Sequence, residues 1–197
     1  IRTGYDEQRA LVRVYTSATE RVPKDDESIS EAARAAVGSE RNPYLMARLI
    51  YQHLLSRLEY TAKPGGKDVL KAFAGSEGDA YTYAMVYCAM LRSMGIPSRP
   101  VAGILVYDRR RTTEHHWVEF YIDGFGWIPV DPALGDGALF GDVPATEAPK
   151  SYYFGNIDEN HVAFSRGEVE TLPVSEDAQI LSYERTFSLQ SVHEATS

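Results

Sequence analysis

The sequence of 197 residues contains a single cysteine, Cys88, and this scarcity excludes two structural devices. No disulfide can form within the chain, and no zinc site can be built from several cysteine thiolates. Basic residues are also few, because 20 Lys and Arg stand against 28 Asp and Glu and give a net charge of −8. Such a chain lacks the basic face that nucleic acid requires, so we expect no nucleic-acid partner.

Long apolar runs are missing as well. The longest, residues 83–91, is far shorter than the roughly 20 residues that span a bilayer, so we expect no membrane-spanning segment. The chain begins at Ile1 rather than Met, from which we expect a processed or truncated N-terminus that has lost any targeting segment. No residue pattern points to a particular oligomeric state or compartment, although an extracytoplasmic location is compatible with such an N-terminus.

What the sequence does contain is typical of an ordinary globular protein. Hydrophobic residues make up 44% and charged residues 24% of the chain. The length suits one domain with a substantial buried core, and no internal repeat divides it. We therefore expect a single domain over residues 1–197, with a helical N-terminal extension at 1–40, a motif-bearing core at 41–132, and a loop and C-terminal strands at 133–197.

The apolar pattern changes period along the chain. It predicts a helix that Asn42 caps and a second helix over residues 80–94 that Gly95 ends. A shorter helix is expected at 31–37. The period then becomes two and predicts strands at 99–107, 117–122 and 127–130, with further short strands near 161–164 and 183–189. Residues 132–149 are expected to form a long loop. Helices followed by an antiparallel sheet indicate an α+β fold.

Three separated motifs stand in a fixed order. Gly78-Asp79-Ala80 opens the predicted second helix, and Gly95-Ile96-Pro97-Ser98-Arg99 follows its end. His115-His116-Trp117-Val118-Glu119 lies at a predicted strand, and Gly126-Trp127 leads to Asp131-Pro132. Taken singly, a cap, a strand histidine or an Asp-Pro turn is common in proteins without any site. Their joint order and spacing give the pattern its specificity.

This pattern resembles the transglutaminase-like superfamily with its papain-like core, of the bacterial transglutaminase-like cysteine protease type. In that family Gly-x-Cys opens the helix, and later segments provide His-x-Trp-x-Glu and Gly-Trp-x-x-x-Asp-Pro. The resemblance implies a transglutaminase core with a Cys-His-Asp triad for thiol-dependent acyl transfer or amide and peptide hydrolysis. It places His115 and Asp131 at the histidine and aspartate positions, and Ala80 at the nucleophile position.

The chemistry of such a site also follows from the residue types alone. A thiol at a helix N-terminus feels the positive end of the helix dipole, which favours the thiolate. A facing histidine takes the thiol proton, and an aspartate fixes the imidazole tautomer. We therefore expect Ala80, His115 and Asp131 to converge in a cleft, with His115 donating a ring hydrogen bond to Asp131.

Ala80 is the departure from the family pattern. A methyl group cannot attack a carbonyl, so the chain as written should be inactive in thiol chemistry. Cys88 cannot replace the thiol, because about 12 Å of helix separates the two positions. Two explanations remain: an engineered Cys-to-Ala change, or a natural relative without the nucleophile. The intact His115 and Asp131 favour the first.

Three kinds of function remain open. The chain is the inactive form of a thiol protease, amidase or acyl transferase with a protein or peptide substrate, or a natural pseudoenzyme that binds a peptide or a cell-wall fragment. The third alternative is a structural domain of a larger assembly. We expect no cofactor and no metal site, since His161 and His193 show no metal-ligand spacing.

Overall fold

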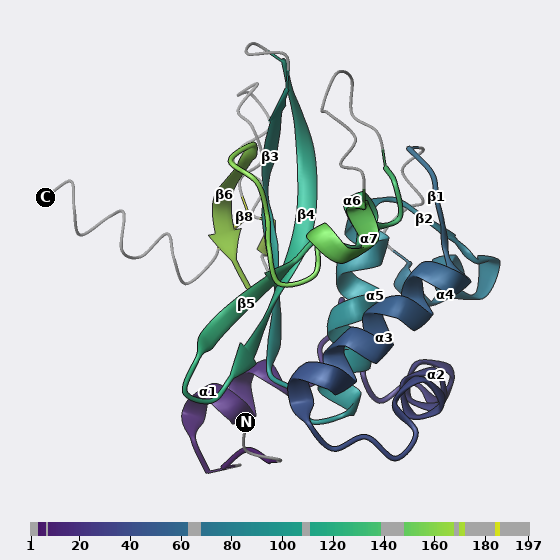
Figure 1. The fold of residues 1–197 in the computed structure, drawn as a ribbon, viewed down its shortest axis with the longest axis vertical. Helices are drawn as coiled ribbons and strands as arrows, with labels where there is room; N and C mark the ends of the chain where they lie inside the picture. The colour runs from purple at the N-terminus through teal and green to yellow at the C-terminus, as the bar shows by residue number, and fades with distance from the viewer. Residues whose placement is uncertain are drawn as a thin grey trace, which may run out of the picture.

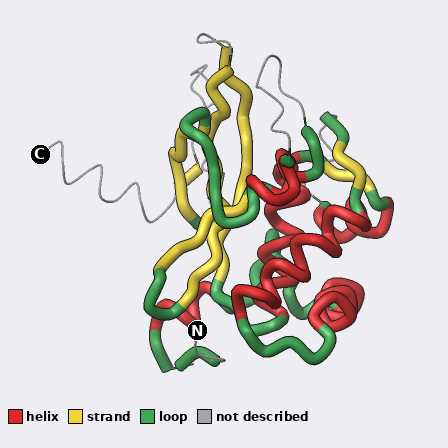
Figure 2. The backbone as a smooth tube through the Cα atoms, in the orientation of Figure 1, coloured by secondary structure: helices red, strands yellow, loops and turns green. Residues whose placement is uncertain are grey.

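The computed structural model describes residues 4–6, 8–62, 68–107, 111–138, 148–167, 170–171 and 184–185. A four-stranded antiparallel sheet forms one layer, and most of the helices pack together beside it (Figure 1). The tube view shows the same division, with the yellow strands of the four-stranded sheet on one side and most of the red helices on the other (Figure 2). This is the predicted α+β arrangement of helices packed on an antiparallel sheet.

The sheet has the strand order β5-β4-β3-β6. The bounds of these strands are β3 Ser98–Tyr107, β4 Arg111–Ile122, β5 Gly126–Val130 and β6 His161–Arg166. β4 begins before the predicted residue 117, so that His115 lies inside the strand. Two short pairs complete the described strands: β1 Glu59–Tyr60 with β2 Glu77–Gly78, and β7 Glu170–Thr171 with β8 Glu184–Arg185.

Side-chain caps begin most of the helices. The bounds are α1 Ala10–Tyr15, α2 Glu27–Val37, α3 Pro43–Arg57, α4 Val69–Gly75, α5 Ala80–Ser93, α6 Pro132–Gly135 and α7 Pro149–Tyr152. Asn42 caps α3 as predicted, because its side chain accepts hydrogen bonds from the backbone N–H groups of Tyr44 and Leu45. α2 begins earlier than the predicted residue 31, because the carboxylate of Asp26 caps it.

Helix α5 is the centre of the core. Every residue from Thr82 to Arg92 is buried, since α2, α3 and α4 cover one side of the helix and strands β3 and β4 cover the other. A helix that is apolar all round is stable only in such a position. The buried guanidinium of Arg92 donates hydrogen bonds to the carbonyl oxygens of Ser98 and Ser17. The C-terminal end of α5 is therefore tied to the start of β3 and to the loop that follows α1.

The C-terminal third differs in part from the prediction. The loop expected at 132–149 begins instead with helix α6, because Asp131 caps it and Pro132 takes its first position. Strand β6 confirms the strand expected near residue 161. Of the strand expected at 183–189, only β8 is described, and the rest of it lies outside the described residues, as do residues 139–147. Within the described ranges every helix is too short or too polar to cross a bilayer.

Candidate functional site

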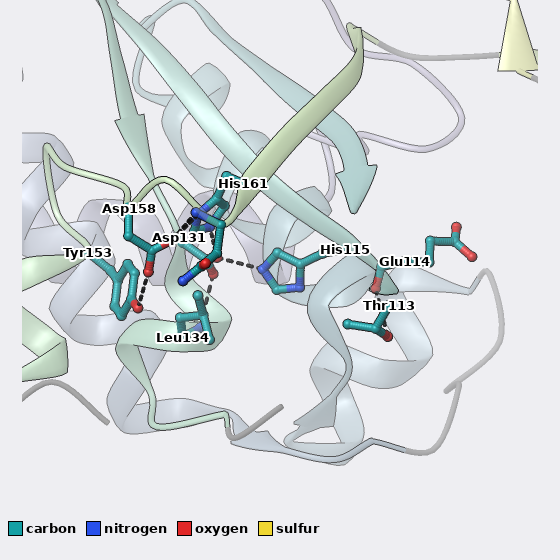
Figure 3. A network of polar contacts seen from close by, with 9 residues as sticks. Thr113, Glu114, His115, Asp131, Leu134, Tyr153, Asp158 and His161 are labelled. Atoms are coloured by element: carbon teal, nitrogen blue, oxygen red, sulfur yellow. Dashed lines mark hydrogen bonds and ion pairs between the residues drawn. The ribbon is translucent and has the colours of Figure 1, made fainter. Parts of the chain in front are cut away.

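A buried pair of side chains joins two neighbouring strands. His115 lies on β4, and Asp131 directly follows β5, which pairs with β4. The Nε2 atom of His115 lies 2.5 Å from Oδ2 of Asp131, and both side chains are fully buried. Figure 3 shows that the carboxylate of Asp131 lies between the imidazole rings of His115 and His161. The predicted hydrogen bond between His115 and Asp131 is thus present.

The carboxylate of Asp131 is held by three N–H groups. Its Oδ1 accepts the backbone N–H of Leu134 at 3.0 Å, which caps helix α6. Its Oδ2 faces Nε2 of His115 and also Nε2 of His161, the latter at 3.0 Å. Burial by itself would raise the pKa of Asp131, but the two imidazoles outweigh burial and hold that pKa well below its usual range. Asp131 is therefore ionised at neutral pH.

His161 is the residue that sequence reasoning missed. Its Nδ1 lies 2.8 Å from Oδ1 of Asp158, so its ring stands between two carboxylates, and its side chain is fully buried. Burial lowers the pKa of His161, but the hydrogen bonds to Asp131 and Asp158 outweigh this and raise it to about 9. Tyr153 extends the chain of contacts, because its hydroxyl donates to Oδ2 of Asp158 at 2.8 Å (Figure 3).

A glycine lets β6 bring His161 to this position. His161 pairs with Leu105 on β3, and the register shifts at Gly103. A Cβ atom at Gly103 would lie 2.1 Å from the carbonyl oxygen of Val162 and 2.9 Å from Cη2 of Trp117. The absent side chain therefore permits the close approach of β6 and the indole. The Trp117 ring then packs beside the two histidines, stacked on His115 and edge-on to His161.

Ala80 is the first residue of α5 and is 7% exposed. Asp79 caps the helix by accepting the backbone N–H of Thr82 at 2.9 Å. The ring of Tyr81 stands edge-on to that of His116, with centroids 5.3 Å apart. This contact places the start of α5 against β4 at His116, the residue that follows His115 in the strand. Burial, together with the neighbouring imidazole of His115, lowers the pKa of His116 to about 4.

His115, Asp131 and His161 could also be considered as metal ligands, since one ligand atom from each lies within 4.8 Å of the others. The donor distances argue against that role. Two ligands of one tetrahedral zinc ion lie roughly 3.3 Å apart at ordinary bond lengths. Here Oδ2 of Asp131 lies 2.5 and 3.0 Å from the two nitrogens, the separations of shared protons. The three side chains are therefore better described as a hydrogen-bonded network than as a set of metal ligands. His193 lies outside the described residues.

Comparisons with known proteins identify the family of the segment that contains Ala80, His115 and Asp131. Residues 30–132, just over half of the chain, match the model of the transglutaminase-like superfamily. An uncharacterized protein of Haemophilus influenzae is 27% identical over 87% of this chain, which spans only 55% of that relative's length.

Two solved structures share the fold. A putative cysteine protease from Cytophaga hutchinsonii superposes with a TM-score of 0.59 at 16% identity, over 82% of this chain and 48% of that one. The periplasmic domain of TgpA from Pseudomonas aeruginosa gives a TM-score of 0.51 at 22% identity, over 66% of this chain and 48% of that one. These likenesses show the transglutaminase and papain-like fold that the sequence motifs imply.

Proposed function

Because the chain belongs to the transglutaminase-like superfamily, we propose that it carries the site of a thiol-dependent acyl transferase or amide and peptide hydrolase with the nucleophile replaced. Ala80 takes the nucleophile position, His115 the position of the base, and Asp131 that of the residue that orients the base. The observation that supports this assignment is the fully buried hydrogen bond between His115 and Asp131. The strand that carries His115 contacts the first turn of α5 through the next residue, His116.

The role of each ring nitrogen of His115 follows from its hydrogen bond to Asp131. Since Nε2 of His115 faces Asp131, Nδ1 is the atom that would take the proton of a thiol at position 80. The thiolate then attacks the carbonyl carbon of a protein or peptide amide. The leaving nitrogen takes the proton from Nδ1 as the C–N bond breaks, and a thioester remains. Water or an amine resolves the thioester, with transfer to water giving hydrolysis and transfer to an amine giving crosslinking.

With Ala80 in place, none of these covalent steps can occur. The methyl group has no lone pair and no proton to transfer, so the chain as written is inactive in this chemistry. The alternative is a natural pseudoenzyme that binds a peptide or a cell-wall fragment. It is supported by the same observation, because the His115–Asp131 pair is intact without a thiol beside it.

The test restores the thiol with Ala80→Cys and follows its alkylation by iodoacetamide against pH. The helix N-terminus and the facing imidazole should stabilise the thiolate, so the midpoint of labelling should lie below the unperturbed value of about 8.5. Cys88 is fully buried and should label far more slowly. Loss of the low midpoint in the double variant Ala80→Cys/His115→Gln would assign the effect to His115.

A matched control is Ala18→Cys, because Ala18 is exposed and lies outside any helix. Its thiol should label with an ordinary midpoint. If the thiol at position 80 titrates like the one at position 18, the assignment of a catalytic site is wrong. Release of peptide fragments by the Ala80→Cys variant would show hydrolysis, and incorporation of an added amine would show transfer to an amine.

A further inference from the structure

We propose that His161 is a positioning residue of this site: as an imidazolium that bridges Asp131 and Asp158, it fixes the carboxylate that orients His115. The positioning role rests on the proposed function of His115, whereas the bridge from Asp131 through His161 to Asp158 is supported by the geometry alone. The unit is then a chain of four groups rather than a histidine–aspartate pair: His115, Asp131, His161 and Asp158.

The protonation state follows from the number of donors that a ring can supply. Both nitrogens of His161 face carboxylate oxygens, Nε2 that of Asp131 at 3.0 Å and Nδ1 that of Asp158 at 2.8 Å. A neutral imidazole carries only one N–H and could donate to only one of them. The side chain is fully buried, so water does not supply the missing donor. Two donations therefore require the imidazolium.

Among the groups packed against His161, the carboxylates favour its positive charge. Asp131, at the end of β5, and Asp158, in the turn before β6, supply the two negative charges. β4 contributes the rings of His115 and Trp117, and the residue after α7, Tyr153, contributes its ring. β3 pairs with β6 through its backbone, opposite His161, at Leu105. Among the described residues named in these contacts, none is a lysine or an arginine.

The outer carboxylate is itself held in place. Oδ2 of Asp158 accepts the hydroxyl of Tyr153 at 2.8 Å, and Oδ1 accepts the backbone N–H of Asn160 at 3.1 Å. Burial would raise the pKa of Asp158, but its hydrogen bonds with His161 and Tyr153 lower it. Asp158 therefore stays ionised and anchors His161 to the backbone of its own turn.

The consequence for His115 is positional. Oδ1 of Asp131 is fixed by the N–H of Leu134, but Oδ2 would be held by His115 alone if His161 were absent. The His161 donor fixes the second oxygen, so that the carboxylate cannot rotate away from His115. A base that must present Nδ1 to a thiol at position 80 requires such a fixed partner at Nε2.

The bridge is tested on the chain as it exists, with ¹⁵N-labelled histidine and NMR detection of the ring nitrogens. At pH 7 both nitrogens of His161 should carry protons, and the ring should titrate near pH 9. Asp158→Asn, which keeps the shape of the side chain, should lower this midpoint by about 1–3 units. The signals of His53, which lies on α3, should not respond. A His161 ring with one protonated nitrogen at pH 7 would overturn the proposal.

The positioning role is tested separately in the Ala80→Cys background. Adding His161→Gln should move the pH midpoint of thiol alkylation back toward about 8.5, because the loosened carboxylate no longer holds His115 toward the thiol. Asp136→Asn weakens a hydrogen bond from Tyr83 outside the bridge and should leave the midpoint unchanged. An unchanged midpoint in His161→Gln would refute the positioning role. If the Ala80→Cys thiol itself is ordinary while His161 is doubly protonated, the proposed function fails and the bridge stands.

Discussion

Asp131→Asn should be among the most damaging single substitutions in this chain, although it changes only one oxygen into an amide nitrogen. The amide can still accept the N–H of Leu134 through its oxygen and so retain the cap of α6. Its NH₂ group then faces Nε2 of His115 and Nε2 of His161, where the carboxylate accepted two hydrogen bonds. The NH₂ group of the new amide therefore faces the N–H of the buried His161 imidazolium, and no hydrogen bond can form between two donors.

Two independent estimates give the loss of unfolding free energy in Asp131→Asn. Each hydrogen bond to a charged group contributes about 1.5–3 kcal/mol, and two are lost here, which gives roughly 3–6 kcal/mol. Removing one partner of a buried ion pair independently costs about 3–5 kcal/mol, because the other charge stays buried. All three side chains are fully buried, so solvent does not weaken these interactions. We expect a loss of about 3–5 kcal/mol in the free energy of unfolding.

Urea denaturation at pH 7, followed by tryptophan fluorescence, measures this loss, since Trp117 packs on His115. Asp136→Asn is the matched control five residues along the chain. Its carboxylate accepts one hydroxyl, from Tyr83 at 2.6 Å. An amide oxygen can still accept this hydroxyl, so the substitution should cost about 1 kcal/mol. Asp131→Asn costing no more than Asp136→Asn would refute the network as a source of stability. The difference from the parent should shrink in acid, because the carboxylate with its depressed pKa stabilises the fold only while ionised.

Two further predictions concern His161 and Gly103, the glycine on β3 that lies against β6. The pKa of His161 is raised to about 9, so its contribution to stability is full below its unfolded value of about 6.5 and is lost as the pH rises through 9. The urea midpoint should therefore fall between pH 7 and pH 10 by more in the parent than in His161→Gln, and equal falls would contradict the bridge. Gly103→Ala should cost about 1–3 kcal/mol in urea denaturation and disturb the His161 NMR signals, because its Cβ meets the backbone of β6. Gly75→Ala, where a Cβ has open space, should be close to neutral, and a neutral Gly103→Ala would disprove the close approach.

The parts of the fold that the sequence predicted are those with local signals. Helix α5 begins at Ala80 because Asp79 caps it, and the left-handed Gly95, with a φ of 74°, follows its end. The β3 and β5 strands follow from a period of two. β4 extends further than its apolar alternation indicates, because pairing with β3 continues back to Arg111. Here tertiary contact, not local pattern, sets the boundary.

The candidate site divides in the same way. His115 and Asp131 were predicted because each lies in a motif of short, fixed spacing. His161 lies 30 residues beyond Asp131 and reaches it only through the pairing of β6 with β3. One signal was present in the sequence: Gly103 interrupts a strand pattern, and such a glycine marks a bulge or a close backbone approach. It could indicate that something packs there, but not that a histidine does.

The network also changes what Ala80 implies. If His115 and Asp131 served catalysis alone, their survival beside an alanine would favour a recent or engineered loss of the thiol. Both residues also stabilise the fold, because Asp131 caps α6 and binds the two buried imidazoles of His115 and His161. Loss of these interactions should cost about 3–5 kcal/mol. A typical domain has only about 5–15 kcal/mol of net stability, so selection for folding alone can keep the network intact. The intact pair is therefore equally compatible with a natural relative that has no thiol, and a cysteine or alanine codon at position 80 of the gene decides between the two origins.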